Sequence, residues 1–231
     1  MTVILPESVL YEDNSLLVID KPAGIPVHSG PSGKDCVEDQ LSVLQGDFTH
    51  APKLVHRLDA DTSGCLILTR HYKTAKKLFK LFEEGGVKKT YIAVVHGTPE
   101  KEEGDINIAL KKISSKEKGW RMIAAKAGKE SLTRYKVLAQ AGTYSLIECK
   151  PETGRTHQLR VHLADIGCPI VGDPMYGDHR EKGAYPLQLM ARRVKFPMGA
   201  QGKIIDVTAP IPSHMEKLVG LIKPDLLEVG E

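Results

Sequence analysis

Short apolar runs that end at turn residues constrain the fold of this chain more than any other feature of its sequence. Residues Leu16–Ile19 form such a run, which leads into the turn sequence KPAG at residues 21–24. Runs of this length that are rich in β-branched residues and bounded by Gly and Pro are typical of buried strands. Similar runs predict further strands at Cys65–Thr69, Tyr91–Val95, Tyr135–Val137 and Ser145–Cys149.

Three segments have helical rather than strand periodicity. Between Thr74 and Glu84 the apolar side chains recur at helical spacing, the lysines fall mainly on the other side, and two glycines end the segment. Similar spacing predicts a second helix over Thr156–Asp165, and a capping-box sequence at Ser213 opens a third that runs towards Ile222. Because strands outnumber helices and short turns join them, we predict an α+β fold with a mixed, mostly antiparallel β-sheet flanked by helices.

The composition is that of an ordinary globular chain. Hydrophobic residues make up 41% and charged residues 26% of it, and Gly and Pro form no repeat, so collagen, coiled coil and extensive disorder are excluded. We find no linker or change of composition and predict a single domain over residues 1–231.

No apolar run approaches the roughly 18 residues of a membrane span. The four cysteines lie far apart with no signal peptide ahead of them, so we expect reduced thiols, a cytoplasmic protein and no membrane partner.

Positive charge is concentrated in parts of the chain. The 32 basic and 29 acidic residues give a net charge of only +3, too small to predict nucleic-acid binding. Between Lys111 and Lys129, however, there are seven basic residues and one acidic residue, together with Trp120. This segment has no convincing periodicity, so we interpret it as a long basic loop or an irregular hairpin. It is a candidate for binding nucleic-acid phosphates, and the alternative is a solvated surface.

The stretch HRLDADTSG at residues 56–64 has the most unusual composition in the chain. Its polar side chains crowd into what we expect to be a loop ahead of the Cys65–Thr69 strand, and loops held by a rigid sheet often carry catalytic groups. The alternative is a turn in which Asp61, Thr62 and Ser63 satisfy backbone donors.

A second polar stretch, TGRTHQLRVH, spans residues 153–162. His157 and Arg160 are three residues apart on the predicted helix and therefore share one of its faces. The start of a helix with basic side chains beside it is also a place where anions bind. The alternative is an amphipathic helix whose polar side faces solvent.

Taken together, these two stretches resemble the RluA-type RNA pseudouridine synthases. The first motif of that family is close to HRLDxxTSG, which residues 56–64 match at every defined position, and residues 154–162 match the second motif, GRTHQ[IL]RVH. The family also places a Tyr at the start of a strand after a basic pair, as Tyr91 follows Lys88 and Lys89. The resemblance runs from about Leu10 to Pro210 and is closest to synthases of large-subunit ribosomal RNA. It leaves no room for the S4-type RNA-binding domain that many of those carry, so we expect none.

The resemblance implies an isomerase that converts specific uridines of structured RNA to pseudouridine, with ribosomal RNA favoured over transfer RNA. It assigns the central carboxylate to Asp59, which would attack the sugar or the base or remove a proton. It assigns the cation that offsets the desolvation of this carboxylate to Arg160, and a contact with the flipped base to Tyr91.

The same resemblance predicts how the target uridine would be held outside the RNA stack. The planar guanidinium of Arg57 would fill the place that the flipped base vacates, and Leu189 would form part of the apolar base pocket. We predict further RNA contacts for basic side chains of both motifs and of the basic segment, namely His56, Arg155, His157, Lys116, Lys118 and Arg121.

Two other classes of protein remain open. A glycosidic hydrolase with Asp59 as nucleophile would need a second carboxylate, and Asp61 on the same short loop is the nearest candidate. A catalytically silent RNA-binding or ribosome-assembly protein would have no need of Asp59, Tyr91 and Arg160 together. We expect no metal, because the histidines lack ligand spacing and are better suited to holding loops by hydrogen bonds, no nucleotide cofactor, because there is no P-loop, and a monomer.

Overall fold

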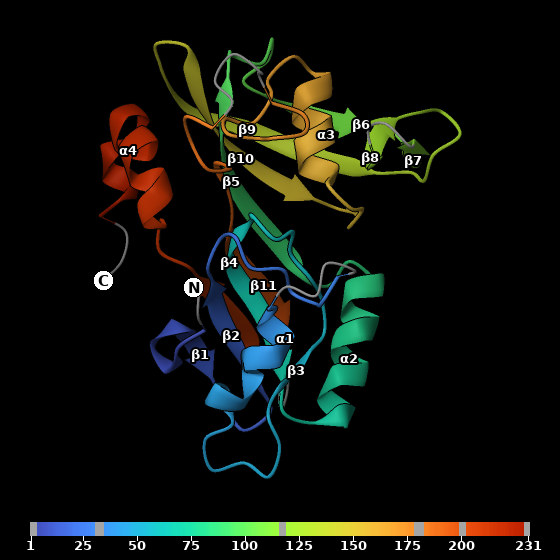
Figure 1. Ribbon diagram of the computed structural model, residues 1–231, viewed down its shortest axis with the longest axis vertical. Coiled ribbons are helices and arrows are strands. Elements are labelled where there is room, and N and C mark those ends of the chain that lie inside the picture. Colours follow the sequence, from blue (N-terminus) through green and yellow to red (C-terminus); the bar gives the residue numbers. More distant parts are fainter. Residues whose placement is uncertain (1–3, 31–34, 116–118, 178–182, 199–201, 229–231) are drawn as a thin grey trace. The chain divides into compact units, whose positions relative to one another are not determined.

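The computed structural model describes residues 4–30, 35–115, 119–177, 183–198 and 202–228. The chain forms two compact units (Figure 1). Unit 1 comprises residues 1–89 and 190–212, and unit 2 comprises residues 90–189 and 213–231. Two of the three boundaries fall inside strands and the third falls at the start of a helix, which explains why no change of composition marks them in the sequence.

Unit 1 is a mixed sheet with one main helix. Its elements are β1 (Val9–Glu12), β2 (Leu16–Lys21), α1 (Val37–Gln40), β3 (Lys53–Leu54), β4 (Ser63–Thr69), α2 (Tyr72–Glu83), β11 (Leu189–Pro197) and β12 (Ile204–Thr208). Antiparallel pairs join β1 to β2, β2 to β4, β3 to β4 and β11 to β12, whereas β11 runs parallel to β4. The strand that carries the end of the first motif, β4, therefore has neighbours on both sides.

The core of unit 1 lies along β2 and β4. Residues 16–19 of β2 and residues 65–68 of β4 are completely buried, and α2 packs against β4 with Leu78 buried beneath it. A strand buried on both faces has a continuous apolar run rather than an alternating one. The two runs that predicted strands here are confirmed, although both strands extend by two residues into polar sequence.

Gly64 allows β4 to approach β11 closely. Its φ is +99°, in the region that favours glycine, and a Cβ atom at this position would lie 2.3 Å from the carbonyl oxygen of Ala191. The parallel register pairs the same two residues. The last residue of the HRLDxxTSG sequence is thus required to seat the start of β4 against the neighbouring strand.

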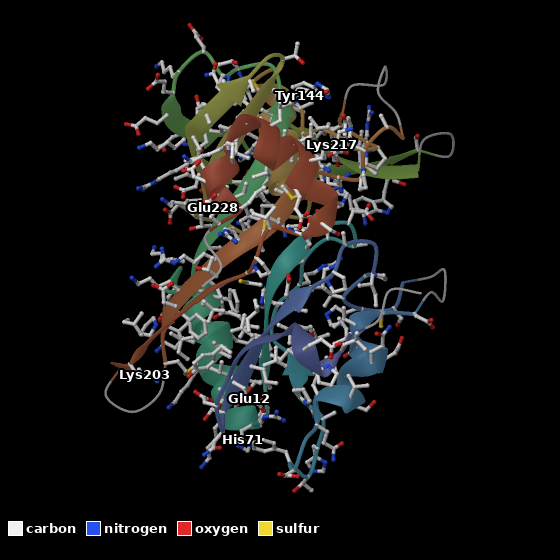
Figure 2. All side chains as sticks on the ribbon, turned by 90° about the vertical axis from the view of Figure 1, so that its left-hand side faces the viewer. Glu12, His71, Tyr144, Lys203, Lys217 and Glu228 are labelled. Atoms are coloured by element: carbon white, nitrogen blue, oxygen red, sulfur yellow. The ribbon has the colours of Figure 1, made fainter. Side chains whose placement is uncertain are left out.

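Unit 2 is an antiparallel sheet with two helices and a separate hairpin. Its elements are β5 (Lys88–His96), β6 (Glu103–Asn107), β7 (Leu110–Ser115), β8 (Gly119–Ala124), β9 (Leu132–Ala141), β10 (Tyr144–Pro151), α3 (Gln158–Asp165) and α4 (Ser213–Ile222). β10 pairs with β5 and β9, β9 also pairs with β6, and β7 pairs with β8. Helix α3 contacts β8 and β10, and α4 contacts β9 and β10; Figure 2 labels Tyr144 at the start of β10 and Lys217 on α4.

The predicted α+β class is confirmed, since the strand pairs given above for the two units are antiparallel except β4 with β11. The basic segment forms the β7–β8 hairpin, which was one of its two interpretations. The helix predicted from Thr156 instead begins at Gln158, because His157 before it has a left-handed φ of +53°. In the part of the chain that the structure describes, no helix is long and apolar enough to cross a membrane.

Candidate active site

The first motif forms the loop between β3 and β4 in unit 1. The apolar side chains of Val55 and Leu58 are buried and anchor it, while Arg57 is exposed and Asp59 is half-buried. The backbone N–H of Thr62 donates to the carbonyl oxygen of Asp59 at 3.1 Å, which closes a turn. This backbone turn places Asp59 just after the buried Leu58.

The buried side chain of Lys21 holds this loop by hydrogen bonds. It is completely buried, and its ammonium group donates to the carbonyl oxygens of Pro22, Ile25 and Ala60 at 2.7, 2.8 and 2.9 Å. The backbone N–H of Gly24 donates to the same Ala60 oxygen at 2.9 Å. Three carbonyl oxygens take all three hydrogens of an ammonium group. The residue directly after Asp59 is thus held by two donors from the KPAG turn.

Lys21 also supplies positive charge to the loop. Burial lowers the pKa of Lys21 to about 8, and the carboxylates of Asp61, Asp59 and Asp20 oppose that shift. Because this pKa lies above 7, the amine is protonated at neutral pH and places a positive charge at the loop that carries Asp59. The sequence analysis did not assign Lys21 a role. The available signal was a lysine directly after a buried strand and before a Pro-Gly turn.

Replacing Lys21 by Met is expected to lower the free energy of unfolding by about 3 kcal/mol, because three inward-facing carbonyl oxygens lose a charged donor. The measurement is urea unfolding at pH 7, with Lys53→Gln, an exposed lysine on β3, as the control. Equal midpoints for the two variants would show that the buried ammonium does not hold the loop.

His56 stabilises the loop by a hydrogen bond. Its Nε2 accepts the backbone N–H of Ile67 at 2.8 Å, and its ring centroid lies 4.9 Å from that of Phe82 on α2. Burial, with a smaller contribution from the Lys89 charge, lowers the pKa of His56 to about 3, so the imidazole is neutral at physiological pH. A neutral ring is consistent with an Nε2 atom that accepts rather than donates.

Two observations concern the hydrolase alternative and the binding of a metal ion. Asp61 is exposed, so it lacks the burial that would make it a general acid paired with Asp59. Within the described ranges, the His, Cys, Asp and Glu side chains form no group of three that could hold a metal ion. All four cysteines are buried and free.

The second motif places Arg160 in a buried ion pair in unit 2. Arg160 Nε and Nη2 donate to the two carboxylate oxygens of Asp173 at 2.7 and 2.8 Å, and both side chains are almost fully buried. Asp173 Oδ1 also accepts the backbone N–H groups of Met175 and Tyr176. Burial alone would raise the pKa of Asp173, but the hydrogen bonds and charge of Arg160 and these N–H groups hold it below its usual range. The bidentate pair therefore fixes the orientation of the Arg160 guanidinium.

A row of aromatic contacts connects the β7–β8 hairpin to Arg160. The Trp120 ring lies 5.1 Å from the His157 ring, and His157 Nδ1 is 3.0 Å from the hydroxyl group of Tyr176. The same hydroxyl accepts the Met122 N–H, and the Tyr176 ring lies 5.2 Å from the Arg160 guanidinium. Because His157 has a left-handed backbone and stands at the N-cap, its ring does not share a helical face with Arg160 as predicted. The contact between them runs through Tyr176.

The other predicted residues of unit 2 lie on several elements. Tyr91 is a half-buried residue of β5 packed against the core of this unit, and Leu189 is a buried member of that core. Arg155 is exposed ahead of α3 with its Nε donating to the Glu130 carbonyl oxygen, and Arg121 is half-buried on β8. Residues Lys116 and Lys118 lie outside the described residues. The sequence analysis missed Asp173 and Tyr176, because the short turn that holds them gives no periodic signal.

Comparison with known families identifies the class of protein to which these two motifs belong. Residues 15–165 match the model of the RNA pseudouridylate synthase family. This match spans more than half of the chain, so the chain belongs to that family and is an isomerase, an RNA pseudouridine synthase. The resemblance inferred from the two motifs is confirmed.

Particular relatives extend the likeness over nearly the whole chain. An RNA pseudouridine synthase of Zymomonas mobilis is 45% identical and covers 93% of this chain and 98% of its own length. Ribosomal large subunit pseudouridine synthase C of Rickettsia bellii is 36% identical over 93% of this chain and 72% of its own. Ribosomal large subunit pseudouridine synthase D of Xanthomonas campestris is 32% identical over 98% and 72%.

Solved structures agree with the fold. The human protein RNA pseudouridylate synthase domain containing 4 has a TM-score of 0.78 and 25% identity, over 98% of this chain and 95% of its own. Human RNA pseudouridylate synthase domain containing 1 has a TM-score of 0.75 and 28% identity, over 88% and 82%.

Proposed function

We propose that this synthase modifies specific uridines of large-subunit ribosomal RNA, with transfer RNA as the second candidate substrate. The observation that carries the choice is the likeness to the synthases C and D described above, both named for the large ribosomal subunit and aligned over more than nine-tenths of this chain. The β7–β8 hairpin and the residues directly ahead of α3 carry basic side chains, which suit a structured, anionic RNA substrate.

The reaction conserves all atoms of the RNA. The C1′–N1 glycosidic bond breaks, the uracil turns, and a C5–C1′ bond forms; C5 then loses its proton while N1 gains one. We assign to Asp59 the carboxylate that attacks or deprotonates the substrate to start this exchange. The Lys21 ammonium, which holds the carbonyl group of the next residue, Ala60, supports that role by keeping the loop fixed.

We assign the remaining groups to holding and exposing the base. Arg57 is exposed on the same loop and can stack in the place of a uridine that has been flipped out of the RNA. Tyr91 contacts the flipped base, and its hydroxyl group can take part in the late proton transfer. Arg160, oriented by Asp173, contributes a fixed positive charge to the reaction. Leu189 contributes apolar surface to the base pocket.

The same proposal extends to further RNA-contacting residues and to the compartment and oligomeric state of the protein. We retain His56, Arg155, His157 and Arg121, together with Lys116 and Lys118, as RNA-contacting residues. A cytoplasmic monomer is the state we propose, in keeping with four buried, free thiols.

The substrate is tested by release of tritium from RNA labelled at uridine C5. Transcripts of large-subunit ribosomal RNA and of transfer RNA are each incubated with the intact protein. We expect release from the ribosomal transcript at a rate well above that from transfer RNA. Release from transfer RNA alone would overturn the choice of substrate while leaving the isomerase intact.

A further inference from the structure

A basic pocket in unit 2 lies beside the second motif but contains none of the residues assigned to catalysis. Its lining residues come from the start of β7, from β8 and the turn after it, and from the segment ahead of α3. Its volume of about 510 Å³ is within the range of about 300–1,000 Å³ that ligand sites occupy. The residues that line it are Leu110, Lys111, Lys112, Met122, Ala127, Gly128, Lys129, Gly154, Arg155 and Thr156.

The wall of the pocket is fixed by backbone contacts. Leu110 and Lys129 exchange two hydrogen bonds, at 2.9 Å from the Leu110 N–H and 2.8 Å from the Lys129 N–H. Gly128 lies so close to β7 that a Cβ atom there would be 2.5 Å from the Leu110 carbonyl carbon. The Gly128 N–H in turn donates to the Ala125 carbonyl oxygen at 2.8 Å. The position of Lys129 relative to the β7 strand is therefore built into the backbone.

The charge of the pocket is positive. Its lining has four basic side chains and no acidic one among the described residues. Arg155 is oriented from both ends: its N–H donates to Gln158 Oε1 at 3.0 Å and its Nε to the Glu130 carbonyl oxygen at 3.1 Å. The Lys112 ammonium lies 4.8 Å from the Trp120 ring centroid. Glu130, next to Lys129, is exposed and does not line the pocket.

Apart from the hydroxyl group of Thr156, the remaining lining is apolar. Leu110 and Met122 are buried and pack with Val161 of α3, while Ala127 and two glycines offer no polar side chain. A cavity with cations on one side and apolar surface on the other matches a nucleotide, which has a charged phosphate and a flat base. A bare inorganic anion would leave the apolar part unused.

We propose that this pocket binds one nucleotide of the RNA strand near the target uridine, with its phosphate against Arg155 and Lys129 and its base or ribose against Leu110 and Met122. The proposal rests on RNA as the substrate. Thr156, which lines the pocket, directly precedes His157, and Arg160 lies three residues after His157 in α3. An occupant of the pocket therefore positions the RNA relative to the helix that carries Arg160. The site contributes to affinity and to the choice of RNA rather than to chemistry.

The test compares Lys129→Gln/Arg155→Gln with a matched control, Lys101→Gln/Lys136→Gln, whose two exposed lysines lie in unit 2 outside the pocket. The dissociation constant of a transcript that the intact protein modifies is measured across a series of salt concentrations. We expect the pocket variant to bind about 10-fold more weakly than the control at 0.1 M salt, with a slope of log K on log salt smaller by about one.

Equal affinities and equal slopes for the two variants would overturn the proposal. A second arm measures the binding of uridine monophosphate alone: if the mononucleotide binds the intact protein but not the pocket variant, while the pocket and control variants bind RNA equally well, the pocket takes a free nucleotide and the proposal is overturned. If the intact protein modifies no RNA at all, the proposed function fails; if it does modify RNA while the slopes agree, only the pocket proposal fails.

Discussion

Replacement of Asp59 by Asn is expected to slow pseudouridine formation by about 10³-fold or more, because the amide can neither attack nor accept a proton as a carboxylate does. The loop should survive the change. The carbonyl oxygens of Asp59 and Ala60 and the buried side chain of Leu58 hold the loop, and the substitution keeps all three. RNA affinity should therefore be unchanged. The rate is measured as tritium release in a single turnover with enzyme in excess.

The same loop offers a matched control for that experiment. Asp61→Asn removes an equal charge two residues away, where the side chain is exposed. We expect this variant to keep the rate of the intact protein within a few-fold. If both variants lost activity equally, the effect would come from the charge balance around Lys21 rather than from a catalytic carboxylate at Asp59.

Replacement of Arg160 by Ala is expected to have two large effects. It leaves the Asp173 carboxylate buried without its cation, which costs about 3–5 kcal/mol of the free energy of unfolding. It also removes a fixed positive charge from the reaction, so turnover should fall by about 100-fold or more, far more than RNA affinity. Urea unfolding, single-turnover rates and RNA dissociation constants measure the three quantities separately.

A double variant separates the structural part of this effect from the catalytic part. In Arg160→Met/Asp173→Asn the buried negative charge is gone, while the Asn oxygen can still accept the N–H groups of Met175 and Tyr176. We expect most of the stability to return and the turnover to stay low. Recovery of both would show that Arg160 has only a structural role.

The ion pair also predicts a pH dependence of stability. Because Arg160 lowers the folded-state pKa of Asp173, the pair contributes its full stability above the ordinary aspartate pKa of about 3.9. The contribution is lost as the pH falls through the still lower folded-state value. The difference in stability between the intact protein and the double variant should therefore be constant from pH 7 to 5 and shrink below pH 4.

The positions of the strands could be predicted because the local sequence determines them. The runs in β2 and β4 are apolar over the residues that are completely buried, and the Pro and Gly residues after the first run mark its end. Likewise the helical spacing before Gly85 predicted α2 to within two residues.

Contacts between distant residues could not be predicted in the same way. Lys21 meets Ala60 across 39 residues, and Gly64 meets Ala191 across the parallel pair of β4 with β11. Asp173 lies 13 residues from Arg160 in a turn, where no periodicity marks it as a partner. The sequence analysis assigned Arg160 to Asp59, and the structure shows it in a bidentate pair with Asp173.

The start of α3 illustrates a local error with a physical cause. Helical spacing continues back to Thr156, but the His157 ring is held by Trp120 and Tyr176, and its backbone takes the left-handed conformation. A side-chain contact with the hairpin therefore accompanies a conformation that residue type alone does not favour. Propensity within the segment contains no information about that contact.

The central claim, that this chain isomerises uridine in RNA, is tested most directly by nucleoside analysis. Unmodified large-subunit ribosomal RNA is incubated with the intact protein or with Asp59→Asn, digested completely and separated by chromatography. We predict that pseudouridine replaces uridine one for one with the intact protein, that no free uracil is released, and that the variant forms none. Free uracil would identify a hydrolase, and bound RNA that contains no pseudouridine would identify a binding protein; either result would contradict the account.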